Sequence, residues 1–149
     1  MIHPTPPDPV DLLQTLIRFD TTNPPGNEAA CVAHIARLLR AAGIQTAILA
    51  RDEGRPNLVA RLPGRGTAPP LLLYGHVDVV PTAGQKWRHP PFSGQIVDGT
   101  LWGRGALDMK GGIAMMVTAI LRAQHEDLDL PGDLVLAVLS DEEVDGEYG

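Results

Sequence analysis

The sequence predicts an α/β domain of three layers, with a mixed, mostly parallel sheet between two layers of helices. Three stretches repeat apolar residues at helical spacing, and four shorter stretches are apolar runs bounded by turn residues. Their order is helix, helix, three strands, helix and strand, which favours a sheet packed between helices. The run from Leu71 to Gly75 is apolar throughout, which is typical of a strand covered on both faces.

The expected helices span residues 9–19, 28–42 and 111–123. Asp8 can cap the first helix, and Pro9 fits its first position. Asn27 is expected to cap the second helix in the same way. The expected strands span residues 44–50, 57–62, 71–75 and 133–139. A hairpin is expected at residues 93–102, because Asp98-Gly99 is a pair that accepts the positive φ angles of a tight turn.

Composition excludes several classes of function. The chain has 149 residues, about one domain, and a net charge of −6 without a basic patch for nucleic acid or an anionic membrane surface. Its longest nearly apolar stretch, residues 113–121, is too short for a bilayer, which needs about 20 residues. No signal peptide is recognised, and the single cysteine, Cys31, is expected in the core without a disulfide. We therefore expect a soluble, cytoplasmic protein.

His76 and Asp78 follow the apolar run at residues 71–75. If strand geometry persists, both side chains point to the same face. A carboxylate beside a metal-binding imidazole orients the ring and raises its basicity. His76 is therefore a candidate metal ligand with Asp78 as its partner, although a surface contact at a strand end would leave the same pattern.

Three further acids stand at comparable places. Asp108 lies among the glycines of residues 103–112, which permit close approach to a ligand, and it could bridge two metal ions or simply cap the following helix. Glu142 and Glu143 follow the last expected strand and diverge in direction. One could bind metal while the other moves protons, or both could belong to a solvated acidic turn. The other histidines fit structural or solvent-facing positions better: His3, His34, His89 and His125.

Considered together, the candidates supply one imidazole and several carboxylates from strand ends and a glycine loop. Sites in open α/β sheets lie at the carboxyl ends of the strands. Such nitrogen and oxygen donors suit hard or borderline divalent cations. The combination therefore predicts a hydrolase that uses two metal ions.

At these residues the chain closely resembles the di-zinc amidohydrolases and exopeptidases. The resemblance rests on GHVDVVP, the spacing from Trp87 to Phe92, DGTLWGRGALDMKGG, SDEE and the early IRFDTTNPPGNE. That family includes N-acetylornithine deacetylase, succinyl-diaminopimelate desuccinylase, aminoacylase and the glutamate-releasing carboxypeptidase. The similarity runs from about Asp11 to Gly149 and implies a zinc exopeptidase-like fold.

The resemblance also implies a role for each candidate residue. His76, Asp108 and Glu143 would be metal ligands, with Asp108 bridging two ions. Asp78 would orient His76, and Glu142 would be the general base and acid. The expected ions are Zn²⁺, with Co²⁺ or Mn²⁺ as alternatives, and the peptide bond after Asp108 would be cis. The implied reaction is hydrolysis of an amide bond in an N-acyl amino acid or small peptide by an activated water.

Members of the family are much longer than this chain. The resemblance therefore implies that residues 1–149 are the N-terminal portion of the catalytic domain, with the sheet incomplete and with the lid or dimerisation domain and the C-terminal catalytic part absent. Each metal would have two protein ligands here, whereas zinc sites have at least three. We expect this chain alone to be inactive and the full-length protein to form a homodimer. A metal-free binding module of the same fold, and a structural subunit, are the alternatives.

Overall fold

The computed structural model of the chain describes residues 4–149. In chain order its elements are α1 (Pro9–Ile17), α2 (Ala29–Ala41), β1 (Gln45–Leu49), β2 (Asn57–Leu62), β3 (Leu71–His76), β4 (Ile96–Val97), β5 (Thr100–Leu101), α3 (Lys110–His125) and β6 (Leu134–Leu139). The three helices and the four main strands begin and end within two residues of the expected positions. None of the helices in the described part of the chain is long and apolar enough to cross a membrane.

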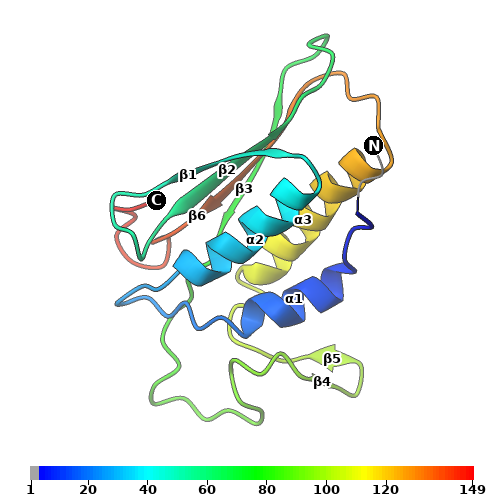
Figure 1. Cartoon of the computed structure of the whole chain (residues 1–149). Coiled ribbons are helices and arrows are strands. Elements are labelled where there is room, and N and C mark those ends of the chain that lie inside the picture. Colours follow the sequence, from blue (N-terminus) through cyan, green and yellow to red (C-terminus); the bar gives the residue numbers. More distant parts are fainter. Residues whose placement is uncertain (1–3) are drawn as a thin grey trace.

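The main sheet has four strands in the order β1-β2-β6-β3 (Figure 1). β3 and β6 are parallel, whereas β1 pairs with β2, and β2 with β6, in antiparallel orientation. The mixed α/β sheet is confirmed, but the described strands pair mostly antiparallel rather than mostly parallel. The connections explain this, because a short turn joins β1 to β2, whereas β3 reaches β6 through the crossover helix α3.

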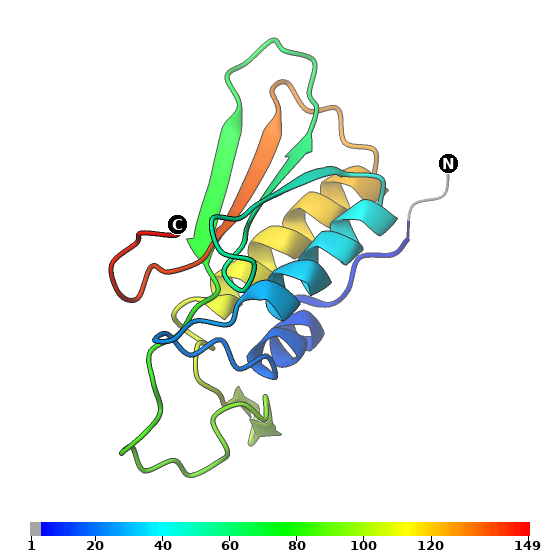
Figure 2. The same cartoon turned by 60° about the vertical axis from the view of Figure 1, so that its left-hand side comes forward.

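All three helices lie on one face of the main sheet (Figures 1 and 2). α2 and α3 pack on the sheet, and α1 packs on α3. The strand residues beneath them are fully buried: Leu58, Ala60, Leu136 and Val138. On the opposite face Leu72 is 55% exposed and Tyr74 is 65% exposed. Residues 4–149 therefore form two layers rather than three, and β3 is covered on one face only, because no described segment crosses the second face.

The starts of α1 and α2 differ in how their free N–H groups are satisfied. Asp8 caps α1 as expected, since its Oδ1 accepts a hydrogen bond from the N–H of Val10 at 2.8 Å. The expected cap of α2 by Asn27 is wrong. Glu28 occupies that position without a side-chain cap, and the carbonyl oxygen of Gly54 accepts the N–H groups of Glu28 and Ala29 at 3.0 and 3.1 Å. A backbone acceptor from a distant turn thus replaces the local one.

Two smaller expectations are confirmed. β4 and β5 form the hairpin, and its turn residues Asp98 and Gly99 have φ angles of 50° and 75°, as a tight turn between antiparallel strands requires. Cys31 is fully buried in the core, and burial raises the pKa of its thiol to about 11. The thiol is therefore a packing group at neutral pH.

The one-sided core predicts unequal effects of two matched leucine substitutions in neighbouring strands. Leu136→Ala in β6 removes a fully buried side chain and should lower the free energy of unfolding by about 2–5 kcal/mol. Leu72→Ala in β3 removes a side chain that is 55% exposed and should change it by about 0.5 kcal/mol. Urea unfolding of both variants measures the difference. Equal losses would contradict the assignment of a covered and an uncovered face.

Candidate metal centre

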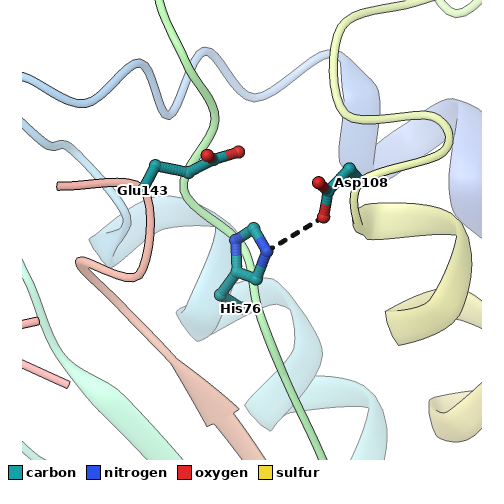
Figure 3. Close-up of side chains that lie close together, drawn as sticks. All are labelled: His76, Asp108 and Glu143. Atoms are coloured by element: carbon teal, nitrogen blue, oxygen red, sulfur yellow. Dashed lines mark hydrogen bonds and ion pairs between the residues drawn. The ribbon is translucent and has the colours of Figure 1, made fainter.

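Three side chains from separate parts of the chain meet at one end of the main sheet (Figure 3). His76 ends β3, Asp108 lies in the loop before α3, and Glu143 lies in the turn after β6. Their donor atoms all lie within 4.8 Å of one another, and His76 Nε2 is 3.2 Å from Asp108 Oδ1. The parallel pairing of β3 with β6, which places His76 opposite Leu139, brings the two strand ends together.

His76 and Asp78 form a buried pair beneath this group. Nδ1 of His76 lies 3.1 Å from the backbone carbonyl oxygen of Asp78 and 3.3 Å from its Oδ1. The two side chains are 6% and 0% exposed, so the alternative of a surface contact is wrong. With Nδ1 facing Asp78, Nε2 points toward the remaining acids, which is the orientation that a metal ligand needs.

The protonation of this pair departs from ordinary values. Burial alone would lower the pKa of His76, but its hydrogen bonds to Asp78 and the charges of Asp78 and Glu142 outweigh burial and raise that pKa to about 9. Burial would raise the pKa of Asp78, but hydrogen bonds from His76, Asn23 and the N–H groups of Glu143 and Glu142 lower it to about 2. Asp78 is therefore held as a carboxylate.

Asp78 also fixes the segment that follows β6, residues 141–148, which we call the acidic turn. Its Oδ1 accepts the N–H of Glu142 at 3.1 Å, and its Oδ2 accepts the N–H of Glu143 at 2.9 Å. A single carboxylate thus orients the imidazole on one strand and the turn at the end of the neighbouring strand. The relative positions of His76, Glu142 and Glu143 depend on it.

Asp108 does not cap α3, so that alternative is wrong. Met109 occupies the cap position, no side chain caps the helix, and the carboxylate of Asp108 faces His76 while remaining 77% exposed. The peptide bond between Asp108 and Met109 is cis, as the resemblance implies. The loop is anchored by Lys110, whose buried Nζ donates to the carbonyl oxygens of Leu16 and Phe19 at the end of α1, at 3.1 and 2.7 Å.

The two neighbouring glutamates have different surroundings. Glu142 is exposed, and its Oε2 lies 3.6 Å from His76 Nε2. Glu143 is half-buried, and burial, together with the charges of Asp108, Asp78 and Glu142, raises its pKa against the opposing effect of His76. The alternative of a solvated acidic turn fits Glu142, which is exposed to solvent. It does not fit Asp141 in the same turn, which is buried. Two side chains that leave the same turn in different environments suit two different tasks.

The donor set fits a divalent cation. Zinc binds imidazole nitrogen and carboxylate oxygen at about 2.0–2.2 Å, so two ligands of one ion lie at most about 4.4 Å apart. His76 Nε2 and Asp108 Oδ1 are 3.2 Å apart, within that limit, and the donor atoms of His76, Asp108 and Glu143 all lie within 4.8 Å of one another. A cavity of about 370 Å³ adjoins them, lined by Tyr74, Gly75, His76, Asp108, Met109, Leu139 and Glu142. A larger hollow, about 590 Å³, lies between residues 5–9 and the far end of α3 and contains none of these side chains.

Several residues that support the site were not among the candidates predicted from the sequence. Asn23, Arg55 and Asp141 are buried and linked to one another beneath the acidic turn. The stretch IRFDTTNPPGNE contains Asn23, and SDEE contains Asp141, whereas no motif in the sequence marks Arg55. Three of the other histidines lie outside the site: His34 packs on Phe19, His89 packs on Trp102, and His125 is exposed at the end of α3. His3 is not among the described residues.

An α/β sheet that gathers an imidazole and carboxylates at its strand ends defines a metal-binding domain of the hydrolase type. Residues 72–149 match the family model described as peptidase family M20/M25/M40. This match covers more than half of the 149 residues and includes His76, Asp78, Asp108, Glu142 and Glu143. The chain therefore belongs to this family of metallopeptidases and related hydrolases.

Individual relatives agree with this assignment. The chain is 40% identical to the succinyl-diaminopimelate desuccinylase of Paracoccus denitrificans (strain Pd 1222), over 96% of this chain and 37% of that protein. Human carnosine dipeptidase 1 superposes with a TM-score of 0.77 at 26% identity, over 91% of this chain and 32% of that one. YXEP of Bacillus subtilis, described as a dinuclear metal-binding peptidase of the M20 family, superposes with a TM-score of 0.63 at 18% identity, over 91% and 35%. The chain thus spans about a third of the length of these relatives.

The buried pair predicts how stability depends on pH in the metal-free chain. The pKa of Asp78 is lowered from 3.8 to about 2, so its contribution is present above 3.8 and is lost as the pH falls toward 2. The pKa of His76 is raised from 6.5 to about 9, so its contribution is present below 6.5 and is lost as the pH rises toward 9. Urea unfolding of the wild type and His76→Gln should show their largest difference between pH 3.8 and 6.5. A difference that does not vary with pH would contradict the coupling.

Proposed function

We propose that this site binds two divalent cations and, in the complete protein, hydrolyses an amide bond of an N-acyl amino acid or small peptide. The observation that carries the proposal is the meeting of His76, Asp108 and Glu143 at the sheet end, with donor atoms within 4.8 Å. The substrate class is supported by the relatives, which are described as a desuccinylase, a dipeptidase and a dinuclear metal-binding peptidase. The desuccinylase and the dipeptidase both act on amide bonds of small molecules.

In this proposal His76 and Asp108 would hold one ion, and Asp108 and Glu143 would hold the other. Zn²⁺ is the favoured ion because the donors are nitrogen and oxygen, with Co²⁺ or Mn²⁺ as alternatives. When bound, such ions lower the pKa of water and polarise a carbonyl group. Asp78 holds the imidazole through Nδ1, at 3.3 Å, so that Nε2 is presented to the ion.

Glu142 is proposed as the group that moves protons. Its carboxylate is exposed to the cavity, 3.6 Å from His76 Nε2, and its own backbone N–H is fixed by Asp78. It would accept a proton from the attacking water and deliver it to the nitrogen of the departing amine. Such positioned proton transfer contributes about 10²–10⁴-fold in rate.

The ligand count of this site is low for zinc. Two protein ligands per ion come from the described residues, whereas catalytic zinc has three plus water. We therefore propose that residues 1–149 form the N-terminal portion of a catalytic domain, and that a further polypeptide segment supplies the missing ligands. Hydrolysis is then expected from the complete protein and not from these residues alone. A cytoplasmic location and a homodimeric state of the complete protein belong to the same proposal.

The division of tasks between Glu142 and Glu143 is tested by metal binding. Co²⁺ titration of the complete protein, followed by its visible spectrum and by competition with a chelator, should show affinity lowered more than about 100-fold in Glu143→Ala and His76→Ala, beyond the cost of losing a group that only supports a ligand. Glu142→Ala should bind Co²⁺ like the wild type, because Glu142 is not proposed as a ligand. Equal loss of Co²⁺ in both glutamate variants would refute the division. A complete wild-type protein that binds no Co²⁺ would favour the metal-free binding module.

A second prediction concerns turnover in the complete protein. Glu142→Gln keeps the size of the side chain but removes its basicity, so it should lower kcat by at least about 100-fold while KM changes little. Release of free amine from N-succinyl and N-acetyl amino acids and from dipeptides measures this. Glu53→Gln, an exposed glutamate in the turn between β1 and β2, is the matched control and should retain full activity. Unchanged kcat in Glu142→Gln would rule out its role in proton transfer.

A further inference from the structure

A buried line of polar and charged side chains runs beneath the acidic turn and ends at the candidate metal centre. Its members come from four separate segments and are each at most 9% exposed: Glu28, Arg55, Asp141, Asn23 and Asp78. None of them is a candidate metal ligand. Burial of so many polar groups is stable only if each is hydrogen-bonded, and each of them is.

Asn23 connects Asp141 to Asp78 within the line. Its Nδ2 donates to Asp78 Oδ2 and to Asp141 Oδ1, both at 2.9 Å. Asp78 in turn accepts the N–H groups of Glu142 and Glu143. One amide therefore joins the carboxylate that orients His76 to the carboxylate that begins the acidic turn.

Arg55 holds Asp141 from the other side. Its Nη2 lies 2.7 Å from Asp141 Oδ1 and 3.2 Å from Glu28 Oε1, and its guanidinium lies 4.7 Å from the ring centre of Tyr148. Burial raises the pKa of Glu28, an effect that Arg55 partly offsets. The other oxygen of Asp141 accepts the N–H groups of Glu147 and Tyr148, at 2.8 and 3.3 Å. Both ends of the acidic turn are thus tied to one carboxylate.

The backbone fixes Asn23 in this position. The N–H of Asn23 donates to the carbonyl oxygen of Val79 at 2.9 Å, and the N–H of Val79 donates to the carbonyl oxygen of Thr21 at 3.1 Å. The hydroxyl of Thr21 donates to the carbonyl oxygen of Val77 at 2.6 Å. Residues 21–23 therefore run beside residues 77–79 on both sides of Asp78, with the parallel bridge between Thr22 and Val79.

We propose that Asn23 is a positioning residue of the metal centre: its amide holds Asp78 against Asp141 and thereby sets where Glu142 and Glu143 lie relative to His76. The inference rests on the proposed function for its consequence, since the positioned groups are the proposed ligands and base. The residue type has a physical reason. An amide donates two hydrogens, one to each carboxylate, and adds no charge, whereas an aspartate there would place a third anion between two buried anions.

Amide hydrogen exchange of the metal-free chain tests the positioning directly. Asn23→Asp and Asn23→Ala should make the N–H groups of Glu142 and Glu143 exchange at least about tenfold faster, because their acceptor Asp78 is no longer held. The N–H groups in the central strand β6, such as that of Leu136, should keep their relative protection. Asn27→Asp, the same substitution at an exposed asparagine four residues further along, is the control and should change neither. Equal acceleration in the turn and in β6, in both Asn23 variants, would show a merely structural role and overturn the proposal.

Co²⁺ affinity separates this inference from the proposed function. In the complete protein both Asn23 variants should bind Co²⁺ about 10–100-fold more weakly than the wild type, as expected when a group that supports a ligand is lost. If the wild type binds Co²⁺ and the Asn23 variants bind it equally well, Asn23 does not position the centre, while the proposed function stands. If the complete wild-type protein binds no Co²⁺ but the turn alone loses protection in the variants, the positioning stands and the proposed function fails.

Discussion

The ionised carboxylate of Asp78, held out of water by donors from three directions, is the interaction on which the arrangement of the site depends. It faces His76 Nδ1 and accepts hydrogen bonds from the backbone N–H groups of Glu142 and Glu143 and from the side-chain amide of Asn23. A buried carboxylate without such partners would be costly to keep charged. These partners come from three segments that are far apart in the sequence. Asp78 can stay charged only when all three are assembled around it, and its charge in turn holds them together.

The sheet supplies the frame for this carboxylate. Parallel pairing of β3 and β6 places the two strand ends side by side, and the crossover through α3 brings the loop of Asp108 to the same edge. Gly75 lets that loop come close, since a Cβ at this position would lie 2.5 Å from Cε of Met109. The ammonium of Lys110, which binds the last carbonyl groups of α1, fastens the loop from the opposite side. The site is therefore held by regular elements rather than by the loop alone.

Sequence reasoning reached the elements and the candidate donors because their signals are local. Periodicity indicated the helices and strands, and polar residues at the ends of apolar runs indicated His76, Glu142 and Glu143. Asn23 and Arg55 could not be predicted in this way, because their partners Asp78 and Asp141 lie 55 and 86 residues away in the sequence. Nothing in the local sequence marks an asparagine as a bridge between two carboxylates. The cap of α2 was missed for the same reason, because the acceptor is the backbone of a distant turn. The second face of β3 was misjudged because an apolar run shows which residues avoid water without showing what covers them.

The position of β6 in the sheet has a consequence for the order of folding. This strand lies between β2 and β3, yet it is made after both. During synthesis from the N-terminus, the hairpin of β1 and β2 can form early, but one edge of β2 and the whole of β3 stay unpaired until β6 emerges. The acidic turn follows β6 directly, so β6, Glu142 and Glu143 join β3 and His76 at the same stage of synthesis, and until then the nascent chain presents open strand edges that favour aggregation.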